Sequence, residues 1–442
     1  MVDYKQYFKG KKITVMGLGL LGRGVGDTAF LAECGAQLTV TDLKTKEQLK
    51  ESLKKLKKYK NIKYVLGEHR LEDFKNKYMI LKNPDIPLDS VYIKEARKNK
   101  IPIEMSASLF VKLSGLKTIA VTGTRGKSTV THLIAHILES AGKKIILGGN
   151  VRGVSNLQLL KNVKGGEMTV LELDSWQLQG FGDAKMSPNI SVFTTFFSDH
   201  MKYYRGSMQK YFKDKANIFK FQQKNDVLVV GKQALPFIKK WQKENKERIK
   251  SKIITAGEKL PKNWKLNLPG VHNEYNAMLS VDVARLVNIP DDKIKKYLTT
   301  FIALPGRLEF LRSVSGIEIY NDNSSTTAEA TLVALRALGK QKNIILIAGG
   351  FNKGLNMNDL IKEIPKYCKE VILLSGTGTE LIKNKIKNSL EVDSMKKAVT
   401  EARALAKVGD IILLSPAFAS FGMFKNEYDR GDQFVNLVKK LK

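Results

Sequence analysis

Short apolar runs alternate along the chain with longer segments in which apolar residues recur at helical spacing. This alternation is typical of an α/β protein, because strands buried on both faces are continuously apolar and the helices that cover them are amphipathic. The pattern therefore predicts a soluble α/β fold with mostly parallel sheets. The runs predicted as strands are residues 12–18, 36–42, 78–83, 100–106, 118–121, 144–150, 168–174, 190–196, 226–231, 317–322, 343–350, 370–376 and 410–416.

Two interruptions of this rhythm divide the 442 residues. One follows the strand-like segment 100–106 and lies near Ser114, and the other precedes a Pro-Gly turn and lies near Thr300. We therefore predict three α/β domains. They are an N-terminal Rossmann-like domain over 1–114, a central P-loop mononucleotide-binding domain over 115–300 and a C-terminal Rossmann-like domain over 301–442.

The middle of the chain has the strand–turn–helix pattern of a phosphate-binding loop. Gly123 and Gly126 allow a tight turn, so that backbone N–H groups and the positive end of the following helix face an anion. Lys127 would reach the β and γ phosphates of a nucleotide, and the Ser128 hydroxyl would ligate Mg²⁺. The usual motif has a further glycine where this chain has Val121, so a turn with an incidental Gly-Lys-Ser is the alternative.

A second glycine-rich turn follows the first predicted strand. Gly17, Gly19 and Gly22 have the G-x-G-x-x-G spacing, and Asp42 stands about twenty residues further on, where a ribose-binding acid belongs. Because any nucleotide diphosphate can use the same helix N-terminus, the motif predicts a nucleotide site without naming the nucleotide. A tight turn without a ligand is the alternative.

Polar residues follow two apolar runs of the central domain. Glu172 stands where a second Mg²⁺ ligand or a water-positioning acid would lie, and Asp199 and His200 follow the run 190–196. A lone histidine can be structural or ligating, and both interpretations of His200 stay open. The next predicted helix carries four lysines that composition places together on a solvated face: Lys210, Lys213, Lys215 and Lys220.

The third domain also has polar residues after its predicted strands. Ligands bind open α/β sheets beyond the carboxyl ends of the strands, so a shared rim is expected. The residues expected there are Asp322, Thr326, Lys353 and Ser420. Arg307 directly follows a Pro-Gly turn, from which it would reach a γ-phosphate or remain an exposed turn residue.

The net charge of +32 is the most unusual bulk property. A nucleic-acid partner, an acidic substrate or a lysine-rich proteome would each explain it. The lysines are spread over every segment, in stretches such as 50–63, 239–252 and 382–389, without an aromatic-interleaved groove. We interpret them mainly as polar helix faces in solvent, which also attract small polyanions.

Further limits come from the cysteines and the apolar runs. Cys34 and Cys368 alone cannot form a disulfide framework or a cysteine metal cluster. No apolar run is long enough to cross a bilayer, and the first residues lack the apolar core of a signal peptide. We therefore expect a cytoplasmic protein.

Taken together, these segments resemble the Mur ligase family along the whole chain. The most specific matches are TGTRGKST at 122–129, the strand that ends at Glu172, SDHM at 198–201, HNEYNA at 272–277, NDNSSTT at 321–327 and LSPAFASFGMFKNEYDRGDQF at 414–434. The last run is most like the family member that adds D-glutamate. The resemblance implies an ATP-dependent ligase that joins D-glutamate to UDP-N-acetylmuramoyl-L-alanine through an acyl phosphate, in peptidoglycan precursor synthesis.

The resemblance also implies roles for the matching positions. ATP would be bound by Gly123, Thr124, Arg125, Gly126, Lys127, Ser128, Thr129, Asn273, Arg307 and Asp322. Mg²⁺ would be held by Ser128, Glu172, His200 and Lys215, the lysine after carbamylation, which makes it a carboxylate-like ligand. The uridine diphosphate would contact Leu20, Leu21 and Lys44, and the muramoyl-alanine end would contact Asn150, Gln177 and His200. The amino acid would contact Thr326, Lys353, Ser420 and Phe421. The catalytic set is Lys127, Glu172, His200, Lys215 and Arg307.

Some positions depart from the family's pattern. Arg125 stands where Asn is usual, Asp174 where Ser is expected and Ser324 where Lys is expected. Ligases that add L-glutamate or another amino acid to a cell-wall precursor therefore remain an alternative. More distant alternatives are a nucleic-acid-stimulated ATPase, suggested by the charge, and a nicotinamide oxidoreductase, suggested by the first glycine turn. The expected partners are small molecules, with no membrane or specific nucleic acid, and the expected state is a monomer.

Overall fold

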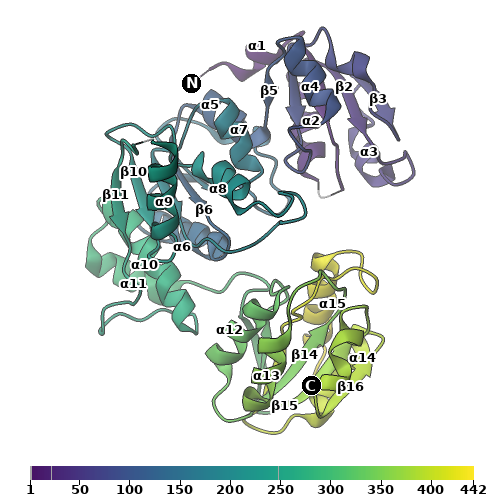
Figure 1. The fold of residues 1–442 in the computed structure, drawn as a ribbon, viewed down its shortest axis with the longest axis vertical. Helices are drawn as coiled ribbons and strands as arrows, with labels where there is room; N and C mark the ends of the chain where they lie inside the picture. The colour runs from purple at the N-terminus through teal and green to yellow at the C-terminus, as the bar shows by residue number, and fades with distance from the viewer. Residues whose placement is uncertain (1, 21, 247) are drawn as a thin grey trace. The chain divides into compact units, whose positions relative to one another are not determined.

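The structure, a computed structural model, describes residues 2–20, 22–246 and 248–442 and contains three mainly parallel sheets (Figure 1). The chain forms two compact units, Met1–Glu258 with Asn276–Tyr297, and Lys259–Tyr275 with Leu298–Lys442. Two sheets belong to the first unit and one to the second. The α/β class and the parallel sheets predicted from the apolar runs are confirmed.

The N-terminal sheet has the strand order β3-β2-β1-β4-β5, and all its pairs are parallel. Met79 and Leu81 of β4 pack in one apolar cluster, whereas Ile80 packs on the opposite face with Ile93 and Ala96. Both faces are therefore buried, as a continuous apolar run requires. The strands are β1 (Lys12–Met16), β2 (Gln37–Asp42), β3 (Ile62–Leu66), β4 (Met79–Lys82) and β5 (Ile103–Glu104), and the helices are α1 (Tyr4–Phe8), α2 (Arg23–Glu33), α3 (Lys50–Leu56), η1 (Leu71–Phe74) and α4 (Val91–Lys98).

The central sheet has the order β11-β10-β9-β6-β8-β7 and is parallel throughout. Its strands are β6 (Lys117–Thr122), β7 (Ile145–Gly149), β8 (Met168–Glu172), β9 (Ile190–Phe193), β10 (Val227–Val230) and β11 (Lys252–Thr255). The helices are α5 (Ser106–Ser114), α6 (Lys127–Ser140), η2 (Leu157–Asn162), α7 (Gln177–Asp183), α8 (Met208–Ala216), α9 (Leu235–Asn245), α10 (Val271–Leu286) and α11 (Asp291–Thr300).

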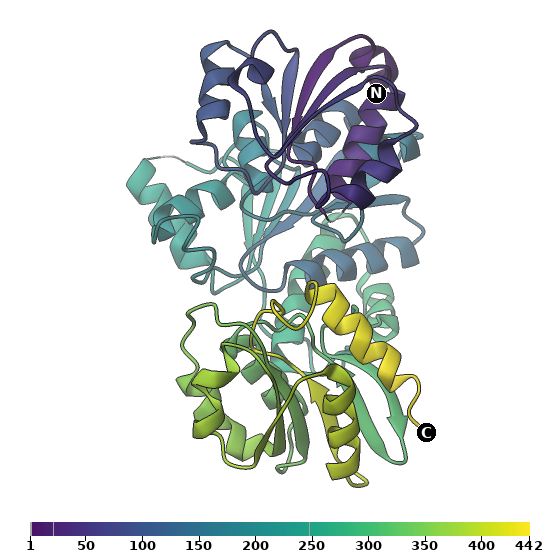
Figure 2. The same ribbon diagram turned by 90° about the vertical axis from the view of Figure 1, so that its right-hand side faces the viewer.

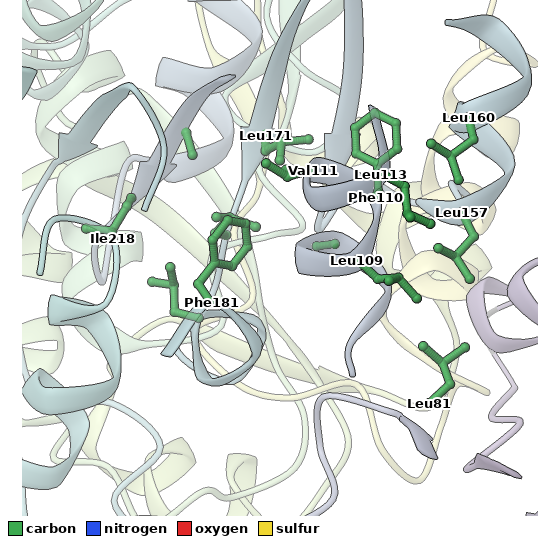
Figure 3. Close-up of a cluster of buried hydrophobic side chains, with 14 of the residues drawn as sticks. Leu81, Leu109, Phe110, Val111, Leu113, Leu157, Leu160, Leu171, Phe181 and Ile218 are labelled. Carbon is green, nitrogen blue, oxygen red and sulfur yellow. The ribbon is translucent and has the colours of Figure 1, made fainter. Parts of the chain in front are cut away.

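Helix α5 gives the two sheets of the first unit a common core. Leu109 and Phe110 of this helix lie fully buried in a cluster that also contains Leu81 of the N-terminal sheet and Leu171 of the central sheet (Figure 3). Leu157 of η2 belongs to the same cluster (Figure 3). Because the core is continuous, the two sheets are stabilised together.

The C-terminal sheet has the order β12-β13-β17-β14-β15-β16, and β12 is its one antiparallel strand. Leu346 of β14 packs towards α12 and α13, while Ile345 and Ile347 pack towards α14 and α15. Figure 2 shows α15 as the last helix, in yellow. The strands are β12 (Glu309–Val314), β13 (Ile317–Asn321), β14 (Ile344–Gly349), β15 (Cys368–Leu374), β16 (Ser389–Val392) and β17 (Ile411–Leu414). The helices are α12 (Ala328–Leu338), α13 (Asn358–Tyr367), η3 (Thr379–Leu381), η4 (Lys383–Lys385), α14 (Met395–Leu405) and α15 (Glu427–Val438).

The structure corrects the interpretation of the lysine-rich stretches as polar helix faces. The stretches 50–63 and 239–252 do contain α3 and α9, but the first runs into β3 and the second into β11. The third, 382–389, contains a 3₁₀ turn and the start of β16. Together with β12, these unpredicted strands lie at the edges of their sheets. Among the described residues, no helix is long and apolar enough to span a membrane.

Candidate active site

The phosphate-binding loop joins β6 to α6 through two glycines in left-handed conformations. Gly123 has φ 144°, and a Cβ there would lie 2.0 Å from Thr194 Oγ1. Gly126 has φ 84°, and a Cβ there would lie 2.4 Å from Asn276 Oδ1. Both positions therefore require glycine. The turn presents the N-terminal amides of α6, which is the geometry of an anion site.

Lys127 and Glu172 lie at the same edge of the central sheet. Glu172 ends β8, which pairs with β6 in the register Val121 to Glu172, and Lys127 is the first residue of α6. Burial lowers the pKa of the Lys127 ammonium, and attraction to Glu172 offsets only part of this effect. Glu172 is 4% exposed and accepts a hydrogen bond from Asn150 Nδ2 at 3.4 Å. A buried carboxylate beside the loop is suited to a hard cation.

Lys215 is buried, which corrects its expected place on a solvated face. Only 1% of the residue is exposed, whereas Lys210, Lys213 and Lys220 are exposed as predicted. Lys215 Nζ donates to the carbonyl oxygen of Gly123 at 2.8 Å. Burial and repulsion from Lys127 lower the pKa of Lys215 well below its ordinary value, which favours the neutral amine. The resemblance singled out this lysine, whereas composition did not.

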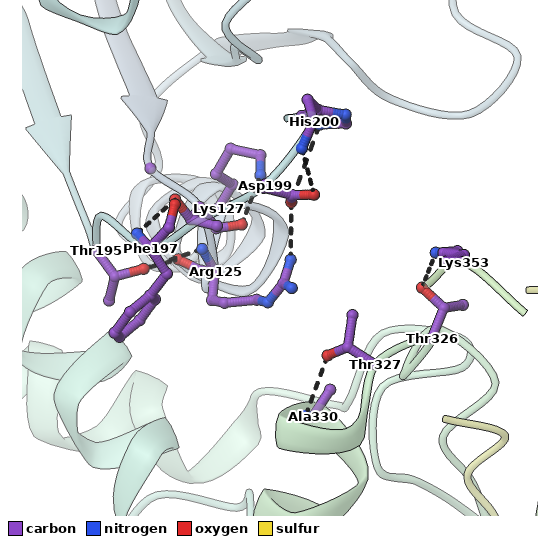
Figure 4. A network of polar contacts seen from close by, with 12 residues as sticks. Arg125, Lys127, Thr195, Phe197, Asp199, His200, Thr326, Thr327, Ala330 and Lys353 are labelled. Carbon is purple, nitrogen blue, oxygen red and sulfur yellow. Dashed lines mark hydrogen bonds and ion pairs between the residues drawn. The ribbon is translucent and has the colours of Figure 1, made fainter. Parts of the chain in front are cut away.

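His200 lies on the loop that follows β9, in a left-handed backbone conformation with φ 55°. Its ring is 4.6 Å, centroid to centroid, from the ring of Trp176. Its backbone N–H donates to Asp199 Oδ1 at 2.9 Å, and Arg125 Nη1 donates to Asp199 Oδ2 at 3.0 Å (Figure 4). Burial lowers the pKa of His200 in spite of Asp199, which favours the neutral imidazole that metals bind.

Few side chains that could hold a metal ion lie beside the loop. In the described part of the chain, no group of three or more His, Cys, Asp and Glu side chains gathers as a metal site. A site here would thus need a hydroxyl such as that of Ser128 and a modified Lys215 beside Glu172 and His200. Of these four residues, Lys215 contacts the loop directly, through the Gly123 carbonyl.

The first glycine turn is organised by Asp42. The carboxylate accepts hydrogen bonds from the backbone N–H groups of Leu18 at 2.8 Å, Gly19 at 3.1 Å and Lys44 at 2.9 Å. Asp42 is 4% exposed, so it supports the loop from inside, which differs from the ribose contact expected of it. Leu20 is exposed and Lys44 is half-buried beside this turn, and Leu21 lies outside the described residues.

Asn150 and Gln177 lie between the two sheets of the first unit. Asn150 Oδ1 accepts a hydrogen bond from Arg23 Nη1 at 2.7 Å. The Gln177 backbone N–H donates to Asp174 Oδ1 at 2.8 Å, and Gln177 Oε1 accepts from the Asp174 backbone N–H at 3.2 Å. Arg23, Lys82 and Gln177 line a small cavity of about 40 Å³. Arg23 and Lys82 were not predicted; the one hint for Lys82 was its position inside an apolar run.

In the second unit, the polar residues predicted for one rim follow β13, β14 and β17. Lys353 Nζ donates to Thr326 Oγ1 at 3.0 Å (Figure 4). Asp322 accepts hydrogen bonds from Ser415 Oγ at 2.8 Å and from the backbone N–H of Leu308 at 3.1 Å. Burial raises the pKa of Asp322 to about 6. A cation and a hydroxyl on neighbouring loops are suited to a carboxylate ligand.

Of the remaining predicted residues of this unit, Ser420 and Phe421 lie at the same rim. Phe351 and Ala419 pair as an isolated antiparallel bridge, which brings Ser420 and Phe421 beside the loop of Lys353. Ser420 is buried, whereas Phe421 is 59% exposed. Asn273 is buried and donates through Nδ2 to the Pro269 carbonyl at 2.8 Å, and Arg307 is exposed.

Three family models match successive parts of the chain. They are the Mur ligase MurD-like N-terminal domain over 11–104, the Mur ligase middle domain over 121–284 and the Mur ligase glutamate ligase domain over 306–418. The UDP-N-acetylmuramoylalanine–D-glutamate ligase of Roseiflexus sp. (strain RS-1) is 34% identical over 97% of this chain and 98% of its own. This chain belongs to the Mur ligase family.

Other Mur ligases are similar in sequence or fold. The UDP-N-acetylmuramoylalanine–D-glutamate ligase of Bacillus subtilis (strain 168) is 33% identical over 96% of this chain and 97% of its own. The MurF ligase of Thermotoga maritima, solved in complex with ADP, has a TM-score of 0.63 at 16% identity and covers 100% of this chain and 99% of its own. The UDP-N-acetylmuramate–alanine ligase MurC of the same organism has a TM-score of 0.61 at 18% identity, and the match covers 97% of this chain and 99% of its own. These structures confirm the three-domain α/β fold of a Mur ligase.

Proposed function

We propose that this Mur ligase joins D-glutamate to UDP-N-acetylmuramoyl-L-alanine at the expense of ATP, in peptidoglycan precursor synthesis. The observation that carries the proposal is the set of residues beside one phosphate-binding loop: Lys127 begins the helix after it, Glu172 ends the neighbouring strand, Lys215 donates to it and His200 is linked to it through Asp199 and Arg125. It occurs in a chain that is 33–34% identical, over nearly its whole length, to ligases of that name. We further propose a cytoplasmic monomer with domains over 1–114, 115–300 and 301–442.

The reaction needs ATP because a carboxylate has no leaving group that an amine can displace. In the first step the alanine carboxylate of the sugar nucleotide attacks the γ-phosphorus, the bond to the bridging oxygen breaks, and ADP leaves. The product is an acyl phosphate. In the second step the amine of glutamate attacks its carbonyl carbon, loses a proton and expels inorganic phosphate through a tetrahedral intermediate. An amide results.

The residues proposed for the first step lower the repulsion between two anions. Lys127 would contact the β and γ phosphate oxygens, the loop amides would hold the phosphates, and Arg307 would contact the γ-phosphate. Mg²⁺, held by Ser128, Glu172, His200 and carbamylated Lys215, would neutralise charge on the phosphate oxygens.

Carbamylation of Lys215 would follow from its environment. The neutral amine nitrogen attacks CO₂ and loses a proton, which gives an anionic carbamate. The depressed pKa of Lys215 supports this step, because it raises the fraction of amine that carries a free electron pair at neutral pH. An unmodified ammonium cannot ligate a cation.

The other proposed roles concern substrate recognition. Leu20, Leu21 and Lys44 would bind the uridine diphosphate, and Asn150 and Gln177 the muramoyl-alanine end. In the second unit, Asn273 and Asp322 would bind adenosine. Thr326, Lys353, Ser420 and Phe421 would bind the amino acid, with Lys353 paired to a carboxylate.

A direct test is phosphate release from ATP and Mg²⁺ with UDP-N-acetylmuramoyl-L-alanine and a panel of D- and L-amino acids. Release that depends on D-glutamate is expected. Release with L-glutamate or another amino acid alone would favour a ligase of different specificity. No release with any pair of substrates would contradict the proposal, as would release that depends on DNA or RNA.

A further inference from the structure

The phosphate-binding loop is tied by its backbone to the segment that leads to His200. The backbone N–H of Thr124 donates to the carbonyl oxygen of Thr195 at 2.7 Å, and that of Arg125 donates to Thr195 Oγ1 at 2.9 Å. The backbone N–H of Phe197 donates to Thr124 Oγ1 at 3.0 Å. The loop and this segment are therefore held as one piece.

The side chain of Arg125 extends this connection as far as His200. Arg125 Nη1 donates to Asp199 Oδ2 at 3.0 Å, while Asp199 Oδ1 accepts the backbone N–H of His200 at 2.9 Å (Figure 4). One carboxylate thus joins the guanidinium to the histidine. The Arg125 and Asp199 side chains are 41% and 30% exposed, so water screens this ion pair only in part.

His200 needs this support because its backbone is left-handed, with φ 55°. A residue with a Cβ stays in that conformation only when its surroundings hold it. The contacts that do so are the Asp199 carboxylate, the backbone N–H of Tyr204 on the His200 carbonyl at 3.1 Å and the Trp176 ring. If Asp199 were released, the His200 ring would shift relative to Trp176.

We propose that Arg125 is a positioning residue that acts through Asp199 and fixes the segment carrying His200 to the phosphate-binding loop. The proposal rests on the proposed function for the roles of the loop and of His200. An asparagine at this position would have neither the length nor the charge of arginine. The tie thus depends on Arg125, and it sets the phosphate-binding loop and His200 in one geometry.

The first experiment uses the nucleotide-free protein, in which the fluorescence of Trp176 reports the position of His200. Arg125→Asn, Asp199→Asn and the double variant are each measured with and without Trp176→Phe, so that the difference isolates Trp176. We expect the two single variants to change the Trp176 fluorescence by the same amount. The double variant should change it no further, and His200→Ala should give the largest change. Arg125→Asn truncates a partly exposed side chain, so the fold is expected to be kept.

A matched control is Arg205→Asn: Arg205 lies on the same loop as His200, and its ion pair with Asp89, which precedes α4, would be lost. That pair has an N–O distance of 2.9 Å, but its side chains are 76% and 58% exposed and do not contact His200. Trp176 fluorescence and kcat are expected to stay at the wild-type values. An equal change in the control would overturn the proposal, since any loop ion pair would then suffice.

Kinetics separate positioning from direct contact with ATP. Arg125→Asn and Asp199→Asn should each lower kcat about tenfold, as misplaced groups do, and leave the KM for ATP within about twofold. The double variant should lose no more than either single variant, and Arg125→Lys should recover part of the loss. A raised KM for ATP in Arg125→Asn alone, or additive losses, would overturn the proposal. If the wild type forms no amide, the proposed function fails, while the fluorescence still tests the tie.

Discussion

Lys215 is where a single residue departs most from what its sequence neighbourhood suggests. It shares a helix with exposed lysines, yet its amine lies against the Gly123 carbonyl in the interior. Amphipathic spacing alone gives no sign of this, because one lysine in a polar stretch looks like the others. The family resemblance identifies it, since matching positions carry chemistry that composition does not.

The depressed pKa of Lys215 leads to a prediction about its modification. Carbamylation uses the neutral amine, so the carbamate should increase as pH rises through the lowered pKa, well before an ordinary lysine would lose its proton. With ¹³C-bicarbonate, a carbamate resonance is expected near neutral pH in the wild type and absent in Lys215→Met. A resonance of equal intensity in both proteins would refute the modification at this site.

Lys127 should be required for phosphate transfer but not for folding. Lys127→Ala removes the cation proposed for the γ-phosphate, so phosphate release should fall by at least about 100-fold. Unfolding temperature should change little, because the desolvated ammonium is not favourable to the folded state. Lys143→Ala, at an exposed position after the same helix, is the control. Amide formation at a normal rate in Lys127→Ala would contradict the assignment.

At the scale of elements, Lys82 orders a loop that faces the first glycine turn. This lysine is 1% exposed, and its ammonium donates to the carbonyl oxygens of Asn83 at 3.0 Å, Pro84 at 3.2 Å and Ile86 at 2.6 Å. A Cβ atom on Gly17 would lie only 2.9 Å from Asn83 Cβ, so the loop and the turn are in close contact. The ammonium thus gathers the loop against the turn proposed for the sugar nucleotide.

Lys82→Met should loosen this loop. Three carbonyls would lose a charged donor, so the free energy of unfolding should fall by about 2 kcal/mol. The KM for the sugar nucleotide should rise while kcat is kept, because the loop shapes binding and touches no reacting group. Denaturant unfolding and steady-state kinetics measure both, with exposed Lys94→Met as the control. An unchanged KM would show that the loop does not contribute to this site.

The strands that are buried on both faces, such as β6 and β14, could be predicted from their continuous apolar runs. The missed strands β3, β11, β12 and β16 all lie at sheet edges. Edge strands have one neighbour and carry charged residues against aggregation, so their sequences resemble polar helices or loops. The glycine turns were located correctly, but the inward use of Asp42 could not be predicted, because spacing does not tell whether a carboxylate faces a ligand or its own loop.

For the whole molecule, the charge of +32 has a testable consequence. If it attracts polyanionic substrates, kcat/KM for the sugar nucleotide should fall as NaCl is raised from about 0.05 M to about 0.3 M, since salt screens such fields. DNA and RNA should leave phosphate release unchanged at every salt concentration. Stimulation by either nucleic acid would point instead to the distant ATPase alternative.

The most direct test of the central claim follows the oxygen atoms of the substrate. UDP-N-acetylmuramoyl-L-alanine labelled with ¹⁸O in its alanine carboxylate is incubated with ATP, Mg²⁺ and D-glutamate, and the released phosphate is analysed by mass. Activation as an acyl phosphate predicts one ¹⁸O atom in each phosphate and an amide product of matching amount. Unlabelled phosphate, released without amide, would contradict the account.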